Sequence, residues 1–509
     1  MDTTTLTSLA AALESEGLLV RAHALPADPL PVCGADSDSR FVRPGHLFVC
    51  KGAAFRPAYL ASALESGAVA YLTGEERADE LARLAPGMPA LVASDVRRAM
   101  ALVALEAWGH PDRDLTCVGI TGTKGKSTTS YMLRSILDAG SPEPRCAIVG
   151  SIETFDGVER AESINTTPEA CDLWRHVANA RDSHLPDLVM EVSSQALKYD
   201  RVVGLHLDVA AFLNIGRDHI SPLEHPTWED YFSSKLRIFR QARTAVVNLA
   251  TDHLDRVLEA AASCERTLLF SATGPEVAGR RADVWCDEVE SGLGRSSFVA
   301  HTPSWEARVE LPMPGLFNVE NALAAICAAE LLGAGRDQVL AGLARVSVPG
   351  RMELVWSDDR RVVGIVDFAH NAMAFSKFGP SVREEFPGYR VISVFGATGD
   401  KAVERRRELP VEAARWSDLL VFTKDDPGHE RVEDICREMA EATPAGTPHE
   451  TVCDRAEAIQ HAVDLAFAGT GPCVVCVLAR GTEGYQHEMG GLTPAPLDMD
   501  LLRAAMARH

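Results

Sequence analysis

A glycine-rich turn between an apolar run and a helical pattern constrains this chain more than any other feature. Its residues are Gly119-Ile120-Thr121-Gly122-Thr123-Lys124-Gly125-Lys126-Ser127-Thr128. Glycines let backbone N–H groups curl around phosphate oxygens, and the N-terminus of the helix that follows favours negative charge. The strict nucleotide pattern G-x-x-x-x-G-K-[ST] requires glycine at position 120, where this chain has Ile120. The glycines at 119, 122 and 125 therefore form a variant phosphate loop.

Two residues of this loop have the chemistry that a nucleotide site needs. Lys126 stands where the loop lysine reaches the β- and γ-phosphates, and Ser127 stands where a hydroxyl binds Mg2+. The flanking patterns support both roles, because Leu115–Ile120 is mostly apolar and Ser127–Ala139 has helical periodicity. The loop predicts ATP or GTP binding and leaves the acceptor of the phosphate open.

Short apolar runs alternate with helical patterns along most of the chain. Val391–Phe395, for example, precedes a charged helical stretch from Lys401. Repeated strand–helix units predict an α/β fold with mainly parallel sheets, covered by helices on both faces. A chain of 509 residues is long enough for about three domains of ~150 residues each. We expect these domains at residues 1–94, 95–346 and 347–509.

Charge and cysteine content exclude several classes of partner. The formal net charge is -22, and because duplex nucleic acid needs a basic surface, we expect no nucleic-acid partner. The 12 cysteines are scattered; Cys473 and Cys476 form a C-x-x-C inside an apolar run, which favours core thiols over a metal or redox pair. No signal-peptide pattern follows Met1, and no apolar run is long enough to span a membrane. We therefore expect a cytoplasmic protein without membrane insertion.

Three polar residues downstream of the loop are candidates for metal or phosphate binding. Glu191 ends an apolar run, where phosphate-loop enzymes place a metal-binding carboxylate, although it would also suit a helix cap. His219 lies in an Asn, Asp and His cluster after another apolar run; a turn histidine is the alternative. Lys235 lies among aromatic residues, and taken alone it predicts a lysine that extends toward solvent.

A series of motifs covers nearly the whole chain: Gly122–Ser127, Asn165–Pro168, Met190–Tyr199, Asn214–Pro226, Lys235, Asn318 with Asn321, Gly350–Glu353, Asp367–Asn371 and Asp425–Pro427. Their order resembles that of the Mur ligases of peptidoglycan synthesis, and among them the UDP-N-acetylmuramoyl-tripeptide synthetases, in particular those that add L-lysine. This resemblance implies an α/β protein of three domains: a UDP-muramoyl-substrate domain, a central P-loop ATPase domain and a Rossmann-like C-terminal domain that binds the amino acid.

The resemblance also implies roles for individual residues. The catalytic residues would be Lys126, Glu191, His219 and Lys235, and the magnesium ligands would be Ser127, Glu191, His219 and a carbamylated Lys235. ATP would contact Gly122, Thr123, Lys124, Gly125, Lys126, Ser127, Thr128, Asn318, Arg351, Asp367 and Asn371. The nucleotide-sugar substrate would contact Ser39, Arg40, Thr166, Thr167 and Ser193.

The same resemblance places the choice of amino acid in the C-terminal domain, at Lys401, Asp425, Asp426 and Glu483. Relatives that add meso-diaminopimelate have Asn-Pro-Arg in this loop, and their arginine binds the second carboxylate; here Pro427 is followed by Gly428. Burying that carboxylate unpaired is costly, whereas an acidic pocket suits a terminal ammonium. We therefore expect L-lysine, with L-ornithine or meso-diaminopimelate as alternatives.

The expected reaction has two steps. The carboxylate of UDP-N-acetylmuramoyl-L-alanyl-D-glutamate attacks the γ-phosphorus of ATP, and the amine of the diamino acid then displaces phosphate from the acyl phosphate, with Mg2+ and Lys126 offsetting negative charge. Another Mur-fold ligase, or a folylpolyglutamate synthetase, is one alternative. A Mur-fold binding subunit that no longer ligates is another, and the presence of all four catalytic residues disfavours it. The chain is expected to act as a monomer.

Overall fold

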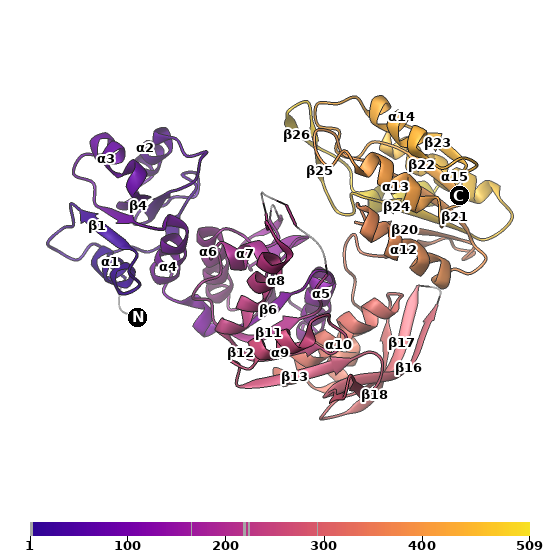
Figure 1. Cartoon of the computed structure of the whole chain (residues 1–509), viewed down its shortest axis with the longest axis horizontal. Helices are drawn as coiled ribbons and strands as arrows, with labels where there is room; N and C mark the ends of the chain where they lie inside the picture. The colour runs from indigo at the N-terminus through magenta and orange to yellow at the C-terminus, as the bar shows by residue number, and fades with distance from the viewer. Residues whose placement is uncertain (1–3, 164, 217–219, 222–223, 293) are drawn as a thin grey trace. The chain divides into compact units, whose positions relative to one another are not determined.

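The computed structural model describes residues 4–163, 165–216, 220–221, 224–292 and 294–509. Strands and helices alternate along the chain, so the predicted α/β class is confirmed (Figure 1). The chain separates into two compact units, one formed by Met1–Cys286, Ala300–Glu306 and Glu320–Gly342, the other by Asp287–Val299, Ala307–Val319 and Leu343–His509. Each of the three predicted domains contains its own large sheet; the boundaries between the domains stay a prediction.

The N-terminal sheet lies in the first unit. Its strand order is β1 (Leu19–His23), β5 (Ala90–Ala93), β4 (Ala70–Gly74), β3 (Leu47–Cys50) and β2 (Ala35–Asp36). β1 is antiparallel to β5, and the other neighbours are parallel. The helices of this region are α1 (Leu6–Ser15), α2 (Pro57–Glu65), α3 (Glu75–Leu84) and α4 (Val96–Ala107). Apolar residues of α1 and α4 belong to the same buried cluster as the core strands of the central sheet, so these two parts share a core.

The central sheet positions the phosphate loop. Its strand order is β18 (Glu306–Leu311), β17 (Arg295–His301), β16 (Val284–Gly292), β13 (Arg266–Ser271), β12 (Ala242–Asn248), β11 (Leu207–Phe212), β6 (Thr116–Thr121), β10 (Asp187–Glu191), β7 (Cys146–Val149), β8 (Glu153–Phe155) and β9 (Arg160–Glu162). The strands from β7 through β10, β6, β11 and β12 to β13 are parallel. Their carboxyl ends therefore meet at one edge, which is where ligands bind in open α/β sheets.

Helices and short strands complete the middle of the chain. They are the 3-10 turn Pro111–Asp114, α5 (Lys126–Leu137), α6 (Ala170–Asp182), α7 (Ser194–Lys198), α8 (Trp228–Leu236), the 3-10 turn Arg237–Gln241, α9 (Leu254–Ala261), β14 (Glu276–Val277), β15 (Arg280–Arg281), α10 (Leu316–Leu331) and α11 (Arg336–Leu343). α5 follows β6 directly, so the predicted strand, turn and helix around the phosphate loop are confirmed (Figure 1).

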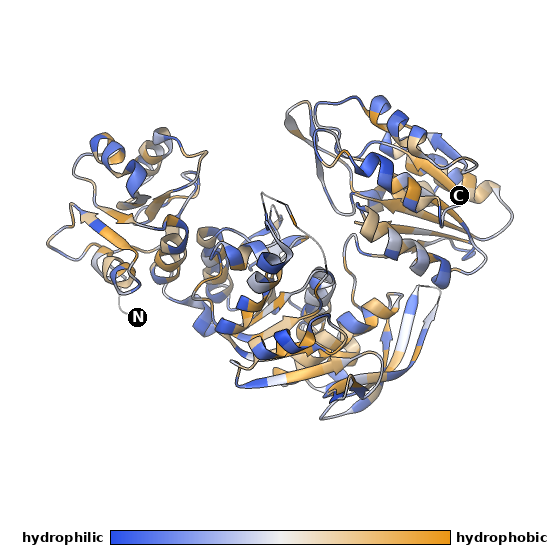
Figure 2. Ribbon diagram, viewed as in Figure 1, coloured by the Kyte–Doolittle hydropathy of each residue, from blue (hydrophilic) through white to orange (hydrophobic). Residues whose placement is uncertain are grey.

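The C-terminal sheet has the order β19 (Glu353–Trp356), β20 (Val362–Asp367), β24 (Cys473–Leu478), β21 (Arg390–Phe395), β22 (Leu419–Phe422) and β23 (His449–Thr451). Apart from antiparallel β19, its strands are parallel. One face packs against α12 (Ala372–Glu385), α13 (Arg405–Ala413) and α14 (Val432–Ala442), and the other against α15 (Arg455–Ala468) and α16 (Asp498–Met506). Figure 2 shows the apolar strands between the polar outer faces of these helices. This is the doubly wound arrangement expected of a Rossmann-like domain.

The paired cysteines of the C-terminal sheet are core thiols, as predicted. Cys473 and Cys476 are both buried in β24, and they belong to the apolar clusters on opposite faces of the sheet. A short hairpin, β25 (Tyr485–Glu488) and β26 (Gly491–Pro494), follows that strand. Within the described residues, no helix combines the length and apolar character that a membrane crossing requires.

Candidate active site

The backbone of the phosphate loop needs glycine at Gly125. This residue precedes α5 with a φ of 90°, in the left-handed region that side chains disfavour. A Cβ atom at this position would also overlap the side-chain oxygen of Asn321. Glycine therefore permits both the turn and the close approach of α10 to the loop.

Neighbouring elements hold the loop from both sides. Asn214, just after β11, accepts a hydrogen bond from Lys124 N at 2.9 Å and donates one to Lys124 O at 3.0 Å. Thr123 Oγ1 lies 3.0 Å from the hydroxyl of Tyr231 on α8 and accepts a hydrogen bond from Gly216 N at 2.9 Å. These contacts fix the loop conformation before any nucleotide binds, which is the preorganisation that a phosphate site needs.

Two lysines converge on one carbonyl of the loop. Lys126 Nζ and Lys235 Nζ donate to Gly122 O at 3.1 and 2.9 Å. Lys235 comes from α8, is 2% exposed, and its ammonium lies 4.8 Å from the centre of the Tyr231 ring. The local sequence alone predicted that Lys235 extends toward solvent. That prediction is wrong, because the structure places Lys235 inside the site.

Both lysines line a cavity of about 210 Å3. Its other lining residues are Asn165, Thr166, Ser193, Ser194, Gln195 and Arg201. The predicted residues Lys126, Thr166, Ser193 and Lys235 therefore lie together. Arg201, which sequence reasoning missed, donates to Thr167 O at 3.0 Å and pairs with Glu169. No motif spacing marks Arg201; only its position after α7 brings it into the cavity.

Glu191 ends β10 with its carboxylate buried among hydrogen-bond donors. Ser151 N donates to Oε1 at 2.8 Å, and Ser151 Oγ donates to Oε2 at 3.2 Å and lies 3.0 Å from Thr166 Oγ1. Thr167 Oγ1 donates to the backbone carbonyl of Glu191 at 2.9 Å. The carboxylate is thus linked to the loop that carries Thr166 and Thr167. Ser151 is a further residue of this network that sequence reasoning missed.

The side chains expected to bind magnesium offer suitable atoms. Ser127 is 8% exposed on the first turn of α5, and its hydroxyl has no hydrogen-bond partner in the described part of the chain. Together with the Glu191 carboxylate it provides oxygen donors, the ligands that Mg2+ prefers. The predicted ligand His219 lies outside the described residues.

A histidine network orients the hydroxyl of Ser194 at the cavity. His225 Nδ1 lies 2.7 Å from Asp230 Oδ2, and Nε2 lies 3.0 Å from Ser194 Oγ. Because a carboxylate only accepts hydrogen bonds, Nδ1 carries the proton toward Asp230. Burial works to raise the pKa of Asp230, but Lys198 and His225 outweigh it and the pKa is lowered.

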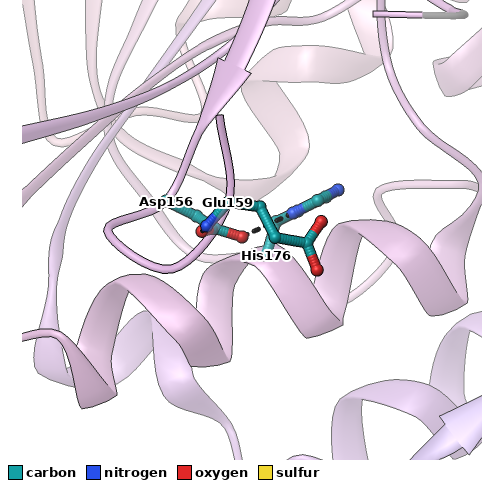
Figure 3. A group of neighbouring side chains, drawn as sticks. All are labelled: Asp156, Glu159 and His176. Atoms are coloured by element: carbon teal, nitrogen blue, oxygen red, sulfur yellow. Dashed lines mark hydrogen bonds and ion pairs between the residues drawn. The ribbon is translucent and has the colours of Figure 1, made fainter. Parts of the chain in front are cut away.

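Asp156, Glu159 and His176 form another cluster of side chains of the kinds that bind metal ions (Figure 3). The oxygens of Asp156 already accept hydrogen bonds from Glu159 N at 2.6 Å and Asn179 Nδ2 at 2.8 Å, and His176 Nδ1 lies 2.6 Å away. Glu159 is paired with Arg175. Because protein donors occupy these oxygens, we assign the cluster a structural role: it fastens the turn between β8 and β9 to α6.

Ser39 and Arg40, which were predicted to contact the nucleotide-sugar substrate, lie after β2. Arg40 donates to Asp38 through Nε at 3.0 Å and Nη2 at 2.5 Å. The Arg40 guanidinium holds the pKa of Asp38 below its ordinary value. Ser39, between them, is half-buried.

Four residues predicted to contact the nucleotide lie in the second unit. Asp367, at the end of β20, accepts hydrogen bonds from Met352 N and Ala369 N, both at 2.8 Å. Burial raises its pKa, and Arg351 partly offsets that rise. The Arg351 guanidinium lies 4.7 Å from the centre of the Phe368 ring. The other two residues make local contacts. Asn318 Nδ2 donates to Pro314 O at 2.7 Å, and Asn371, the cap of α12, accepts a hydrogen bond from Ala374 N at 2.9 Å.

The predicted amino-acid site lies at the carboxyl ends of β21, β22 and β24. Asp425 is 7% exposed, and within the described residues its carboxylate accepts no hydrogen bond. Burial raises the pKa of Asp425, and Arg455 and Arg480 partly offset that rise. A buried carboxylate of this kind is costly unless a cation pairs with it, so Asp425 is suited to bind an ammonium group.

Asp426 differs from Asp425 because it already has partners. Lys401 Nζ lies 2.9 Å from Asp426 Oδ2, and His487 Nδ1 lies 3.1 Å from it. Burial works to raise the pKa of Asp426, but Lys401 and the backbone N–H of His487 outweigh it, so the pKa is lowered. The two adjacent aspartates therefore differ in their partners. The fourth predicted residue, Glu483, follows β24, and its backbone carbonyl accepts a hydrogen bond from Arg480 at 2.6 Å.

The sequence matches two family models in the order of these sites. Residues 120–329 match the Mur ligase middle domain, and residues 350–481 match the Mur ligase, glutamate ligase domain. Lys126 and Ser127 of the phosphate loop lie in the first match, and Lys401, Asp425 and Asp426 lie in the second. Fold and sites together define a Mur ligase.

Two relatives narrow the class. The chain is 37% identical over 487 residues to a UDP-N-acetylmuramyl-tripeptide synthetase of Lactobacillus delbrueckii subsp. bulgaricus, covering 92% of each. It is 34% identical over 476 residues to the UDP-N-acetylmuramoyl-L-alanyl-D-glutamate--L-lysine ligase of Enterococcus faecalis, covering 92% of this chain and 90% of the relative. The chain belongs to the UDP-N-acetylmuramyl-tripeptide synthetase family, so the resemblance is confirmed.

A solved structure extends the likeness to the fold. The MurF ligase of Thermotoga maritima, in complex with ADP, superposes with a TM-score of 0.61 at 20% identity, covering 93% of this chain and 97% of that one. At this identity the likeness shows the Mur ligase fold alone.

Proposed function

We propose that the protein ligates an amino acid to UDP-N-acetylmuramoyl-L-alanyl-D-glutamate, with conversion of ATP to ADP and phosphate, in peptidoglycan synthesis. The cavity that brings Lys126 and Lys235 together with Thr166 carries this proposal. The Lys126 ammonium beside a phosphate loop suits a phosphoryl group in transfer. Thr166 belongs to the segment that the resemblance assigns to the nucleotide-sugar, and the names of the relatives support the same reaction.

The nucleotide is ATP in this proposal. The phosphate loop supports a nucleoside triphosphate, and the ADP in the Thermotoga maritima relative supports adenine. Ser127 and Glu191 would hold Mg2+, with His219 as a further ligand. When bound, the ion supplies positive charge that stabilises the phosphoryl oxygens during transfer.

The residues of the chain orient the reactants for two steps. The glutamate carboxylate of the substrate attacks the γ-phosphorus, and ADP leaves as an acyl phosphate forms. Lys126 offsets charge on the β- and γ-phosphates, while Thr166 and Ser193 hold the substrate. The amine of the incoming amino acid then attacks the acyl carbon, phosphate leaves and the amine loses a proton. Most of the rate enhancement would come from positioning and electrostatics.

Lys235 would act as a carbamate. Reaction of its amine with CO2 gives an anion with two oxygens, which is a better magnesium ligand than an ammonium. Its burial beside Gly122 and Tyr231 supports this, because a carbamate kept from bulk water is protected against hydrolysis. Mass spectrometry of the intact protein under CO2 would show an added 44 Da for one carbamate, about the mass of CO2.

L-lysine would be the amino acid added. Asp425 supports an ammonium-ended side chain, and the name of the Enterococcus faecalis relative, an L-lysine ligase, supports lysine itself. Gly428 has a φ of 61° and lies beside the Asp400 carboxylate, so this position offers no cation to a second carboxylate. L-ornithine and meso-diaminopimelate are the alternatives.

Product analysis tests the proposed ligation. The protein is incubated with ATP, Mg2+, UDP-N-acetylmuramoyl-L-alanyl-D-glutamate and one amino acid at a time, and the products are weighed by mass spectrometry. We expect the mass of the substrate plus one lysine minus one water. If no mixture yields a product that contains an added amino acid, the result would contradict the ligase assignment and favour a binding subunit.

We further propose that the protein is a cytoplasmic monomer. Its 12 cysteines are all free thiols, which suits a reducing compartment. Light scattering during size-exclusion chromatography would give the mass of a single chain; a mass twice as large would contradict the monomer.

A further inference from the structure

Arg455 is a buried arginine placed directly behind the amino-acid site. It is the first residue of α15 and is 3% exposed, and its partner Asp498, the first residue of α16, is 1% exposed. Arg455 Nε and Nη2 donate to the two carboxylate oxygens of Asp498 at 2.7 and 2.6 Å. This bidentate pairing fixes the plane of the guanidinium group.

The remaining donors of Arg455 hold two loops. Nη1 donates to Lys424 O at 3.0 Å, and Nη2 donates to Leu478 O at 2.8 Å. Lys424 immediately precedes Asp425, and Leu478 ends β24 just before Ala479 and Arg480. One side chain therefore fixes the starting points of both loops that carry the acidic residues of the amino-acid site.

Charge supports the same connection. The negative charges of Asp425, Glu483 and Asp498 attract the guanidinium groups of both Arg455 and Arg480 and favour their charged forms. Burial works to lower the pKa of Arg455, but Asp498, Asp425 and Glu483 outweigh it and the pKa is raised.

We propose that Arg455, locked by Asp498, is a positioning residue of the amino-acid site: it sets where the loops after β22 and β24 begin and so places Asp425 for the side-chain ammonium of the substrate. The assignment of that ammonium rests on the proposed function. Lysine cannot replace Arg455, because a single nitrogen cannot span Asp498 and two carbonyls with the fixed geometry of a guanidinium.

Arg361 offers a matched control in the same domain. Its Nη1 donates to Gly469 O at 2.7 Å and Ala466 O at 3.3 Å, and its Nη2 donates to Phe467 O at 3.3 Å. It thus holds backbone carbonyls at the end of α15, whereas Arg455 holds them beside the start of that helix. Arg361→Lys should remove comparable hydrogen bonds without releasing the amino-acid loops.

The first measurement is amide hydrogen exchange on the full chain of each variant. We expect Arg455→Lys to speed exchange in residues 423–428 and 479–484 by about tenfold or more, as released loops open more often. Arg361→Lys should leave exchange in both loops unchanged. Asp498→Asn keeps the shape of its side chain, and it should give a smaller change at the same loops. Unchanged exchange in both Arg455→Lys and Asp498→Asn, or equal changes in Arg361→Lys, would overturn the positioning role.

The second measurement is steady-state kinetics with the amino acid that the wild type uses. We expect the KM for that amino acid to rise about tenfold or more in Arg455→Lys, since the lost hydrogen bonds are charge-assisted. The KM for ATP, whose phosphate loop lies in the first unit, should change less than about twofold. A fall in kcat with an unchanged amino-acid KM would overturn the proposal. If the wild type uses no amino acid, the proposed function fails, and hydrogen exchange alone decides the positioning role.

Discussion

The phosphate-loop site and the amino-acid site are built in different ways. The first is one continuous turn whose backbone is held by Asn214, while the Thr123 hydroxyl contacts that of Tyr231 and Lys126 and Lys235 donate to the same carbonyl. The second consists of side chains from three loops, held by the buried pair of Arg455 and Asp498 and by the pair of Lys401 and Asp426. A site made of backbone keeps its ligand when side chains change, whereas a site made of side chains can change its ligand by a few substitutions. This difference suits an ATP site common to a family and an amino-acid site that varies within it.

The largest effect should come from the phosphate loop. Lys126→Ala should lower kcat about 10³-fold or more, because a preorganised positive charge acts most strongly on charge that develops during phosphoryl transfer. Lys124→Ala is the matched control in the same loop. The contacts of Lys124 with Asn214 use backbone atoms, which alanine retains. Single-turnover ADP formation measures both; equal losses would show that the ammonium of Lys126 has no special role.

Lys235→Ala should cost about 10²- to 10³-fold in kcat, as expected for the loss of one charged group beside the transferring phosphoryl. If the functional group is a carbamate, a short carboxylic acid should restore part of the activity by supplying two oxygens. ADP release is measured with and without acetate. Lys126→Ala serves as the control that acetate should not rescue, since its role needs a cation. Absence of rescue in Lys235→Ala would count against the carbamate.

Asp425→Asn should raise the KM for lysine about 10- to 100-fold, the cost of losing a charge-assisted hydrogen bond in a buried site. Asp426→Asn is its matched neighbour and should have a smaller effect on the KM, because Lys401 and His487 already pair with Asp426. Steady-state kinetics with varied lysine separate the two. A larger effect at Asp426 would reverse the assignment of roles within this loop.

The smallest expected effect concerns stability. Because the pKa of Asp425 is raised, its proton is held more tightly in the folded protein than in the unfolded chain. The carboxyl group therefore stabilises the fold at low pH, and that contribution is lost as the pH rises through its folded-state pKa. The melting temperature of Asp425→Asn should therefore be a few degrees higher than that of the wild type at pH 7. A shift of this size corresponds to a difference of about 1 kcal/mol in the free energy of unfolding.

The advantage of Asp425→Asn should shrink as the pH falls toward 3.8, the ordinary pKa of the group. Thermal melting between these pH values measures the difference. An advantage that does not depend on pH would show that charge burial is not its cause.

The strand, turn and helix of the phosphate loop could be predicted from sequence because they are local, whereas the resemblance alone implied a place for Lys235 in the site. The loop, Glu191 and Lys235 lie in short motifs, and parallel strands bring their ends to one edge. Ser151 and Arg201 were missed because neither belongs to a local motif; the first follows β7, and the second follows α7. Isolated polar residues of this kind are recognisable only when the sheet order is known.

The amino-acid site was predicted less fully, for a physical reason. Asp425 and Asp426 are adjacent in the sequence and both are buried, but only Asp426 is paired with Lys401 and His487, and sequence does not show such partners. The role of Arg455 depends on contacts with Lys424 and Leu478, which are 31 and 23 positions away along the chain. Such long-range contacts leave no periodic pattern in the sequence.

The most direct test of the central claim is ADP release by the wild type with UDP-N-acetylmuramoyl-L-alanyl-D-glutamate and either L-lysine or meso-diaminopimelate. The structure predicts that ADP release depends on the amino acid, and that kcat/KM is about 100-fold higher for L-lysine, because an unpaired second carboxylate is costly to bury. A preference for meso-diaminopimelate would contradict the role of Asp425 and Gly428. No release of ADP with any amino acid would contradict the ligase itself.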